Sequence, residues 1–173
     1  MPRKDKESNA AKLFDYFYLV HYQLNMAIED VMRGNLSRKE AALLLLLYAE
    51  GGPSACLPRK MIVNRFASWF DATSSNVTKI IARLASRDFS LVDVSNAPGS
   101  ERDKQIGLTA KGRDNVRGML QRGARHSQLL LGGISEEDLA IGLEFFQKAS
   151  IYTDSLLPLQ MLSQERKNRG NTP

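Results

Sequence analysis

Two short amphipathic segments joined by a three-residue turn restrict the fold of this chain more than any other feature of its sequence. The first runs from Pro58, a residue suited to the first turn of a helix, to about Phe70. The second runs from Ser74 to about Arg87, with Thr73 as its N-cap. The side chains expected to face inward are Met61, Ile62, Phe66 and Trp69 in the first segment and Val77, Ile80, Ile81 and Leu84 in the second. Two short helices joined by so tight a turn form a helix-turn-helix unit.

A longer amphipathic segment precedes this unit, between about Asn9 and Arg33, and Gly34 is its expected C-cap. Its apolar residues recur at spacings of four and three, the pattern of a coiled-coil-like seam: Leu13, Phe17, Val20, Leu24, Ala27 and Val31. A second row of residues widens the apolar stripe: Phe14, Tyr18, His21 and Ile28. Because one small domain cannot cover so wide a stripe, we expect this helix to take part in a dimer interface.

The segment between these two regions carries a capping box. Ser37 is followed three residues later by Glu40, so the serine caps the helix and the glutamate reaches back to the chain before it. Residues 43–47 of this helix are all leucine, and the Gly-Gly-Pro sequence at residues 51–53 ends it. We therefore predict that it is the most buried element of the fold.

After Asp88 the apolar residues alternate instead of following a helical period. Two alternating segments, 91–94 and 106–108, flank a polar loop at residues 96–104, which predicts a β-hairpin with a long charged tip. Thr109 is the expected cap of a further helix that runs to about Leu131, where two glycines follow.

The C-terminal region predicts one more long helix, capped by Ser135 and ended or kinked by Pro158. Its apolar residues are Leu139, Leu143, Phe146, Ile151 and Leu156. The fold class is thus mostly α with a small β-hairpin wing, a winged helix-turn-helix flanked by N- and C-terminal dimerisation helices. The expected boundaries are 1–36 for the N-terminal dimerisation helix, 37–112 for the winged helix-turn-helix, 113–163 for the C-terminal dimerisation helices and 164–173 for a disordered tail.

The charge of the chain is concentrated in its middle third. Residues 59–125 hold thirteen basic and six acidic side chains, whereas residues 1–58 are neutral and residues 126–173 carry a net charge of −2. A local excess of this kind favours a polyanion-binding surface over a generally basic protein, although a solvated basic face has the same composition. A single cysteine, Cys56, excludes an intramolecular disulfide and a cysteine-based metal cage. No apolar run approaches the roughly 20 residues that span a bilayer, and the N-terminus is not a secretory signal, so the cytoplasm is the expected compartment.

In the order of its elements and in two motifs, the chain resembles the MarR (multiple antibiotic resistance regulator) family of winged helix-turn-helix transcriptional regulators. The first motif is Val77-Thr78-Lys79-Ile80-Ile81-Ala82-Arg83-Leu84, which is similar to the recognition helix of the family. The second motif begins with Arg102 and continues, after the five residues 103–107, with Leu108-Thr109-Ala110-Lys111-Gly112. It resembles the end of the wing and the start of the next helix. The resemblance runs from about Leu36 to Phe146. It implies a dimeric transcriptional regulator that binds double-stranded DNA, and an effector of phenolic or other amphipathic character.

The sequence departs from the family pattern at two functional positions. Ser100 stands where the family usually has an aspartate before the wing arginine, so Glu101 or Asp103 is left as the alternative partner of Arg102. Asp88 replaces the glycine that normally ends the recognition helix, and aspartate tolerates the left-handed backbone conformation better than most residues.

The expected DNA contacts follow from the helix period. With Val77, Ile80 and Leu84 buried, the opposite face of the helix presents small polar and basic side chains, and Arg102 and Lys104 lie at the wing. The candidate DNA-binding residues are Ser74, Ser75, Asn76, Thr78, Lys79, Arg83, Arg102 and Lys104. Asn76 is a candidate reader of adenine, and Arg83 of guanine or phosphate. Ser74 and Ser75 suit phosphate contacts, and the wing residues suit a narrow minor groove.

Two further groups carry weaker hypotheses. The aromatic residues Phe14, Phe17, Tyr18 and Tyr22 line a ligand pocket if the family resemblance extends that far, but core or dimer packing is the favoured interpretation. Cys56 is a redox sensor or, in the favoured interpretation, a quiet, partly buried thiol. His21 and His126 are too far apart to indicate a metal site, and no cofactor is expected.

The resulting hypothesis is a sequence-specific regulator, a repressor that binds a pseudo-palindromic operator as a dimer and is released by a small molecule or an oxidant. One alternative is an architectural or replication accessory DNA-binding protein without an effector. Another is a winged-helix interaction module that has lost DNA binding. An enzyme is the least favoured class, because the sequence has no nucleophile paired with a base and no glycine-rich loop that cradles phosphate.

Overall fold

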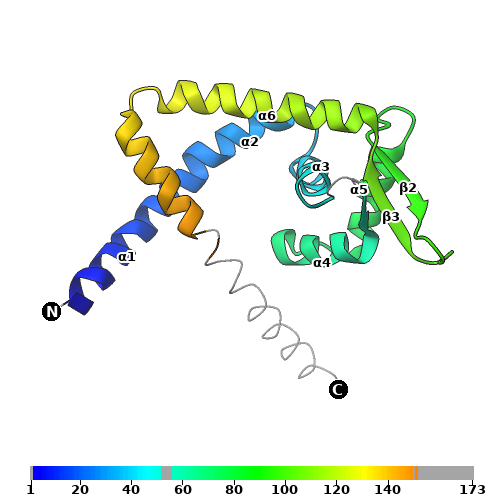
Figure 1. Cartoon of the computed structure of the whole chain (residues 1–173), viewed down its shortest axis with the longest axis horizontal. Helices are drawn as coiled ribbons and strands as arrows, with labels where there is room; N and C mark the ends of the chain where they lie inside the picture. Colours follow the sequence, from blue (N-terminus) through cyan, green and yellow to red (C-terminus); the bar gives the residue numbers. More distant parts are fainter. Residues whose placement is uncertain (1, 52–55, 150, 152–173) are drawn as a thin grey trace, which may run out of the picture. The chain divides into compact units, whose positions relative to one another are not determined.

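The computed structural model describes residues 2–51, 56–149 and 151. The chain forms two compact units, Met1–Leu130 and Leu131–Pro173. In the first unit, α4, α5 and a β-hairpin lie at one end, and the long helices extend away from them (Figure 1). Within the described residues, no helix has both the length and the apolar character that crossing a membrane requires.

The first unit begins with one long helix in three parts, α1 (Pro2–Leu19), η1 (Val20–Asn25) and α2 (Met26–Arg33). The predicted helix is confirmed, but it starts at Pro2 instead of near Asn9 and contains a π-helical segment that the apolar spacing did not reveal. It ends as expected at Gly34, whose φ of 56° is readily adopted by a residue without a Cβ.

The next helix, α3 (Arg38–Glu50), begins with the predicted capping box. Ser37 Oγ accepts a hydrogen bond from the Glu40 backbone N–H at 3.3 Å, and Glu40 Oε2 accepts one from the Ser37 N–H at 2.8 Å. The leucines at residues 43, 44, 46 and 47 are buried, which confirms α3 as the centre of the core. The rest of the core comes from Leu36 just before α3, from Ala41 of α3 and from the later part of the first unit: Leu57, Ile62, Phe66, Ala72, Val77, Ile81, Leu84, Leu91, Val92, Ile106, Leu108, Val116 and Met119.

The helix-turn-helix consists of α4 (Arg59–Phe70) and α5 (Ser74–Ala85). Asp71 in the turn has a left-handed φ of 48°, Ala72 is buried, and Thr73 Oγ1 accepts a hydrogen bond from the Asn76 N–H at 3.3 Å. The expected N-cap is therefore confirmed.

The expectation that Trp69 faces inward is wrong, since 46% of its surface is exposed. Only Ile62 and Phe66 of α4 are buried, so the buried stripe of this helix is narrow. Trp69 lies at its edge, with its ring centroid 6.4 Å from that of Phe66.

A three-stranded antiparallel sheet follows the order β1-β3-β2, with β1 at Cys56–Pro58, β2 at Val92–Asn96 and β3 at Lys104–Leu108. The β2–β3 pair is the predicted hairpin, and Asn96 pairs with Lys104 at its outer end. Strand β1 was not predicted, because three residues are too few to show an alternating pattern. As a consequence Pro58 ends β1 and precedes α4, instead of being the first helical residue.

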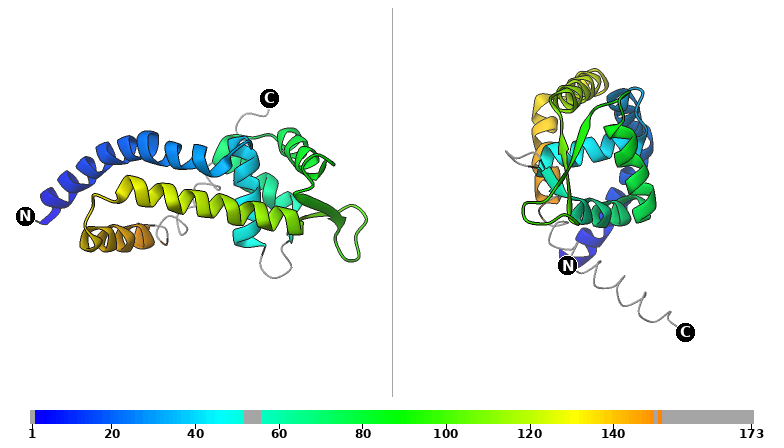
Figure 2. Two further views of the ribbon diagram at one scale, coloured as in Figure 1. Left: turned by 90° about the horizontal axis from the view of Figure 1, so that it is seen from above. Right: turned by 90° about the vertical axis from the view of Figure 1, so that its right-hand side faces the viewer.

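The last helix of the first unit is α6 (Ala110–Leu131), and it lies beside α2 (Figure 2). Its predicted cap is confirmed, since Thr109 Oγ1 accepts a hydrogen bond from the Gly112 N–H at 2.9 Å. Arg122 Nη2 of α6 donates to the Met32 carbonyl at 2.6 Å, which joins α6 to the end of α2.

In the second unit, residues 136–149 form a helix. Ser135 Oγ accepts a hydrogen bond from the Asp138 N–H at 3.2 Å, as expected of its cap. Leu143, Phe146 and Ile151 are exposed. The predicted end of this helix at Leu156 and Pro158, and the tail at 164–173, lie outside the described residues.

Candidate nucleic-acid interface

The outer face of α5 is polar and exposed. Val77 and Leu84 are fully buried and Ile81 nearly so, which turns the opposite face of the helix to solvent. All six candidate contact residues of this helix are exposed: Ser74, Ser75, Asn76, Thr78, Lys79 and Arg83. The first turn of α5 holds no acidic residue, so nothing there repels an approaching anion.

Arg59, which the sequence analysis did not select, connects α4 to this face. Its Nη2 donates hydrogen bonds to Ser74 Oγ at 3.1 Å and to Thr78 Oγ1 at 2.6 Å. Thr78 Oγ1 in turn donates to the Ser74 carbonyl at 2.8 Å. Two of the predicted contact residues are thus joined to one guanidinium, a link between residues 15 and 19 positions apart that no local sequence pattern reveals.

The tip of the hairpin is a compact turn held by Ser100. The Ala97 N–H donates to the Asp103 carbonyl at 2.7 Å, and the Ser100 hydroxyl binds both the backbone N–H of Asp103 at 3.1 Å and its carboxylate at 3.0 Å. The Ser100 hydroxyl therefore stabilises the turn through its two hydrogen bonds with Asp103. Arg102 is exposed and forms no ion pair with Glu101 or Asp103 among the described residues, so neither carboxylate is the brace considered above.

A groove runs between the hairpin and the first turns of α4 and α5. It is lined by Pro58, Arg59, Lys60, Val63, Ser74, Ala97, Arg102, Asp103, Lys104 and Gln105. Four of these side chains are cationic and one is acidic. In the described part of the chain, none of the four cations is neutralised by an ion pair; Lys104 instead donates to Asn96 Oδ1. Three of the wing and helix residues predicted from sequence, Ser74, Arg102 and Lys104, therefore line one groove together with Arg59 and Lys60.

Arg83 lies in a different environment from the other candidates. Its Nε is 3.1 Å from Glu40 Oε1, and its guanidinium carbon is 5.2 Å from the centroid of the Phe89 ring. Glu40 is only 2% exposed, whereas 57% of the Arg83 side chain is exposed. One oxygen of Glu40 thus completes the cap of α3, and the other holds an arginine of α5.

The segment after α5 differs from expectation. The helix ends at Ala85 rather than near Arg87, and the left-handed residue is Ser90, with a φ of 50°, not Asp88. The Ser90 N–H donates to the Ser86 carbonyl at 2.7 Å, and its hydroxyl donates to the Arg87 carbonyl at 3.1 Å. These bonds hold a conformation that a side chain otherwise disfavours.

The Leu-Thr-x-x-Gly motif has a packing explanation. Thr109 Oγ1 donates to the Ser90 carbonyl at 2.7 Å, which brings the start of α6 against the backbone before β2. A Cβ at Gly112 would lie 2.0 Å from the Leu91 carbonyl oxygen, so only glycine fits there.

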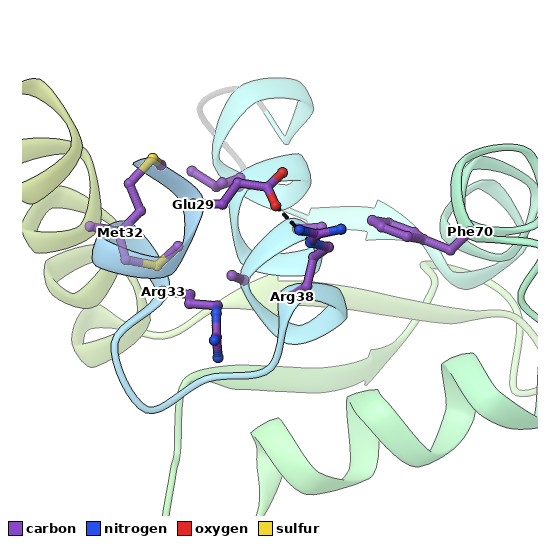
Figure 3. Close-up of a pocket in the computed structure, with 9 residues that line it drawn as sticks. Glu29, Met32, Arg33, Arg38 and Phe70 are labelled. Atoms are coloured by element: carbon purple, nitrogen blue, oxygen red, sulfur yellow. Dashed lines mark ion pairs between the residues drawn. The ribbon is translucent and has the colours of Figure 1, made fainter. Parts of the chain in front are cut away.

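A second, largely apolar pocket lies between α2, α3, the end of α4 and α6 (Figure 3). It is lined by Glu29, Met32, Arg33, Arg38, Ala41, Ala42, Leu45, Phe70 and Met119. Glu29 Oε2 and Arg38 Nε form an ion pair at 2.6 Å at its wall. The aromatic residues considered for a ligand site, Phe14, Phe17, Tyr18 and Tyr22, do not line this pocket; they are exposed on α1 and η1.

Cys56 carries a free thiol and is half-buried on β1. In the sheet it lies opposite Gly107 of β3. No group of three or more histidine, cysteine or acidic residues in the described ranges is arranged to hold a metal ion.

Several solved structures of low sequence identity share this architecture. A MarR-family protein from Bacillus stearothermophilus matches with a TM-score of 0.69 and 17% identity, over 86% of this chain and 97% of its own. BpsR from Bordetella bronchiseptica, whose DNA binding is regulated by 6-hydroxynicotinic acid, matches with a TM-score of 0.57 and 22% identity, over 80% of this chain and 98% of its own. A mutant of MepR from S. aureus, solved with a bound oligodeoxyribonucleotide, matches with a TM-score of 0.55 and 19% identity, over 83% of this chain and 97% of its own. No protein-family model and no curated protein matches the chain.

These matches show the fold: the chain has the winged helix-turn-helix architecture of MarR-type regulators. They extend over nearly the whole length of each solved chain.

Proposed function

We propose that this chain, which has the fold of the MarR-type regulators, is a sequence-specific DNA-binding transcriptional regulator rather than an enzyme. The observation that carries the proposal is the groove beside α5. Arg59, Lys60, Arg102 and Lys104 line it, and no carboxylate of the described residues pairs with any of them. A row of unneutralised cations next to the exposed start of a recognition helix matches the phosphate backbone of DNA.

In the proposed complex, the first two turns of α5 enter the major groove and the hairpin tip reaches the neighbouring minor groove. Asn76 is exposed at the third position of α5, where its amide can pair with the N6 and N7 atoms of adenine. Lys79, one turn further, is exposed on the same face and suits a guanine or phosphate contact.

A homodimer completes the proposal. Apolar and aromatic side chains of α1 are exposed in the single chain, among them Leu13, Phe14, Tyr16 and Leu19. An exposed apolar surface of this extent is typical of a protein interface. A two-fold dimer places two α5 helices on successive major grooves of a pseudo-palindromic operator, which makes repression by promoter occupancy the expected mode of action in the cytoplasm.

The apolar pocket of Figure 3 is the proposed effector site, in place of the aromatic set of α1. Its wall combines apolar side chains with Arg33 and Arg38, which suits a small amphipathic or phenolic molecule. BpsR, with the same fold, responds to 6-hydroxynicotinic acid. A ligand here relieves repression only if it binds more tightly to the dimer shape in which the α5 helices are misplaced.

The test is binding of the full chain to the DNA upstream of its own coding region. Fluorescence anisotropy is measured at several salt concentrations, with a scrambled duplex of equal length as competitor. The proposal predicts tight binding that depends on sequence and weakens steeply with salt. Salt-dependent binding that shows no sequence preference, both on this upstream DNA and on fragments selected from the genome by binding, would instead identify an architectural protein. No binding to any duplex at low salt, by protein freed of bound ligand through unfolding and refolding, would identify an interaction module.

A further inference from the structure

A further pocket of the first unit lies between the loop after α2, the loop after α5 and α6. Its volume is about 470 Å³. It shares no residue with the groove beside α5, and only Arg33 with the pocket of Figure 3. It is therefore a separate site, which neither the proposed DNA contacts nor the proposed effector pocket uses.

Two exposed charges of opposite sign line this pocket, Lys111 of α6 and Asp88 of the loop after α5. Neither forms an ion pair, with the other or with any residue in the described ranges. A ligand that carries both a carboxylate and an ammonium group can bind both side chains at once.

The two arginines of the pocket are already engaged by the fold. Arg33 Nη2 pairs with Asp30 Oδ1 at 2.9 Å, and Arg122 Nη2 donates to the Met32 carbonyl at 2.6 Å. Lys111 is thus the cation that is available to the carboxylate of a ligand.

Asn115 follows Lys111 by one turn of α6 and also lines the pocket. Its Oδ1 is buried and has no hydrogen-bond partner in the part of the chain that the structure describes. A buried oxygen in this state is unfavourable, and rotation about the last side-chain bond exchanges it with the amide nitrogen. The rotated amide presents its oxygen to a ligand, where it can accept a hydrogen bond from an ammonium group.

The remaining wall of the pocket is apolar. Leu36 and Leu91 are buried members of the core, and Phe89 is half-buried. These side chains suit the apolar body of a small molecule. The ring of Phe89 also packs on the guanidinium of Arg83, so a ligand here would lie next to α5.

We propose that this pocket binds a free α-amino acid with an apolar side chain. Its carboxylate pairs with Lys111, its ammonium group lies between Asp88 and Asn115, and its side chain packs on Leu36 and Leu91. An anion without an ammonium group would be repelled by Asp88, and an amine without a carboxylate would be repelled by Lys111. The proposal adds a ligand site to the proposed function and does not depend on it.

The test is isothermal titration calorimetry of the full chain without DNA, after refolding from denaturant into buffer free of amino acids. L-Leucine, L-isoleucine, L-valine, L-methionine and L-phenylalanine are titrated separately. At least one is expected to bind with saturation at millimolar concentration or below. The hydroxy acid and the amine with the same carbon skeleton are expected to bind at least about tenfold more weakly. If none of the five binds, or if the hydroxy acid binds as tightly as the amino acid, the proposal is wrong.

Substitutions then locate the bound amino acid. Lys111→Met and Asp88→Asn change exposed side chains, so the fold is expected to persist while the affinity falls at least about tenfold. Asp88→Asn is also expected to lose the preference for the amino acid over the hydroxy acid. Arg117→Met is the matched control, because Arg117 is an exposed residue of α6 that pairs with Asp114 and does not line the pocket. Wild-type affinity in both pocket variants would place the ligand elsewhere and overturn the proposal.

Asn115→Leu separates a ligand contact from a structural role. It is expected to weaken amino-acid binding without lowering the midpoint of thermal unfolding, because the oxygen that it removes has no partner in the fold. A lower midpoint with unchanged binding would assign the amide to the fold and contradict the site. Since every measurement is made without DNA, a chain that binds DNA but no amino acid contradicts this proposal alone, and the reverse result contradicts only the proposed function.

Discussion

At the scale of single residues, Gly112 shows how one missing side chain sets the position of a helix. A Cβ there would overlap the Leu91 carbonyl oxygen at 2.0 Å, and both partners are backbone, so neither can rotate away. Gly112→Ala is expected to lower the free energy of unfolding by about 2–4 kcal/mol, measured by urea denaturation.

Gly118→Ala is the control for this prediction. It lies on the same helix and meets only the flexible end of Arg122, at 3.4 Å. Alanine there is expected to be neutral or to stabilise α6 by about 0.5–1 kcal/mol. Equal losses in the two variants would contradict the packing explanation of the motif.

Arg83 is the predicted base reader whose guanidinium already pairs with another residue of the fold. Its pairing with the buried carboxylate of Glu40 gives it a structural role in joining α5 to α3. Arg83→Met removes the ion-pair partner of the buried Glu40 carboxylate, which keeps its hydrogen bond from the Ser37 N–H. We expect it to destabilise the protein by about 1–2 kcal/mol, below the value for a fully buried pair because Arg83 is largely exposed.

The double variant Glu40→Gln with Arg83→Met identifies the coupling between the two residues. A structural pair predicts that the second substitution adds little to the loss caused by the first, as seen in thermal unfolding. Additive losses would mean that the two side chains act independently.

Asn76 is the complementary case, an exposed residue whose side chain forms no hydrogen bond or ion pair within the described part of the chain. Asn76→Ala is expected to leave stability unchanged, to reduce operator affinity by about 1–3 kcal/mol and to relax the preference at one base pair. A uniform loss on operator and scrambled duplexes would reassign Asn76 to the phosphate backbone.

At the scale of elements, the hairpin β2–β3 is stabilised by the pairing of its two strands and by the turn around Ser100. Arg102 takes part in neither of these contacts. Arg102→Ala is therefore expected to keep the fold and the oligomeric state while it weakens DNA binding about tenfold. Anisotropy and analytical ultracentrifugation on the same sample check both parts. Unchanged affinity would remove the wing from the proposed complex.

At the scale of the whole molecule, the exposed apolar side chains of α1 predict that the single chain is not the functional form. Phe14 is 72% exposed. Phe14→Glu places a charge in the proposed dimer interface, and is expected to shift the protein to a monomer that binds operator DNA at least about tenfold more weakly. Sedimentation velocity measures the first effect.

Lys12→Glu, an exposed change on the same helix, is the matched control and is expected to leave the dimer intact. Dimeric Phe14→Glu protein would place the dimer interface elsewhere. A monomeric wild type would reject the dimer altogether.

Local patterns in the sequence determined most of the elements and the polar face of α5. The capping residues Ser37, Thr73 and Thr109 were identified correctly because a cap binds a backbone group only two or three residues away. The periods of the apolar residues located the helices and the hairpin for the same reason, and the two apolar rows of the N-terminal helix indicated that a single small domain would leave it partly uncovered.

Tertiary structure decided the contacts between residues that are distant in the chain. The pairing of β1 with β3, the link from Arg59 to Thr78 and the pairing of Arg83 with Glu40 join residues 19 to 51 positions apart. No periodicity extends over such separations, and side chains of the same type look alike in sequence whether they face solvent or a partner. Sequence therefore identified α5 and its exposed residues, whereas the fold alone decided which arginines are already engaged and which cations share one groove, because these properties depend on distances across the core.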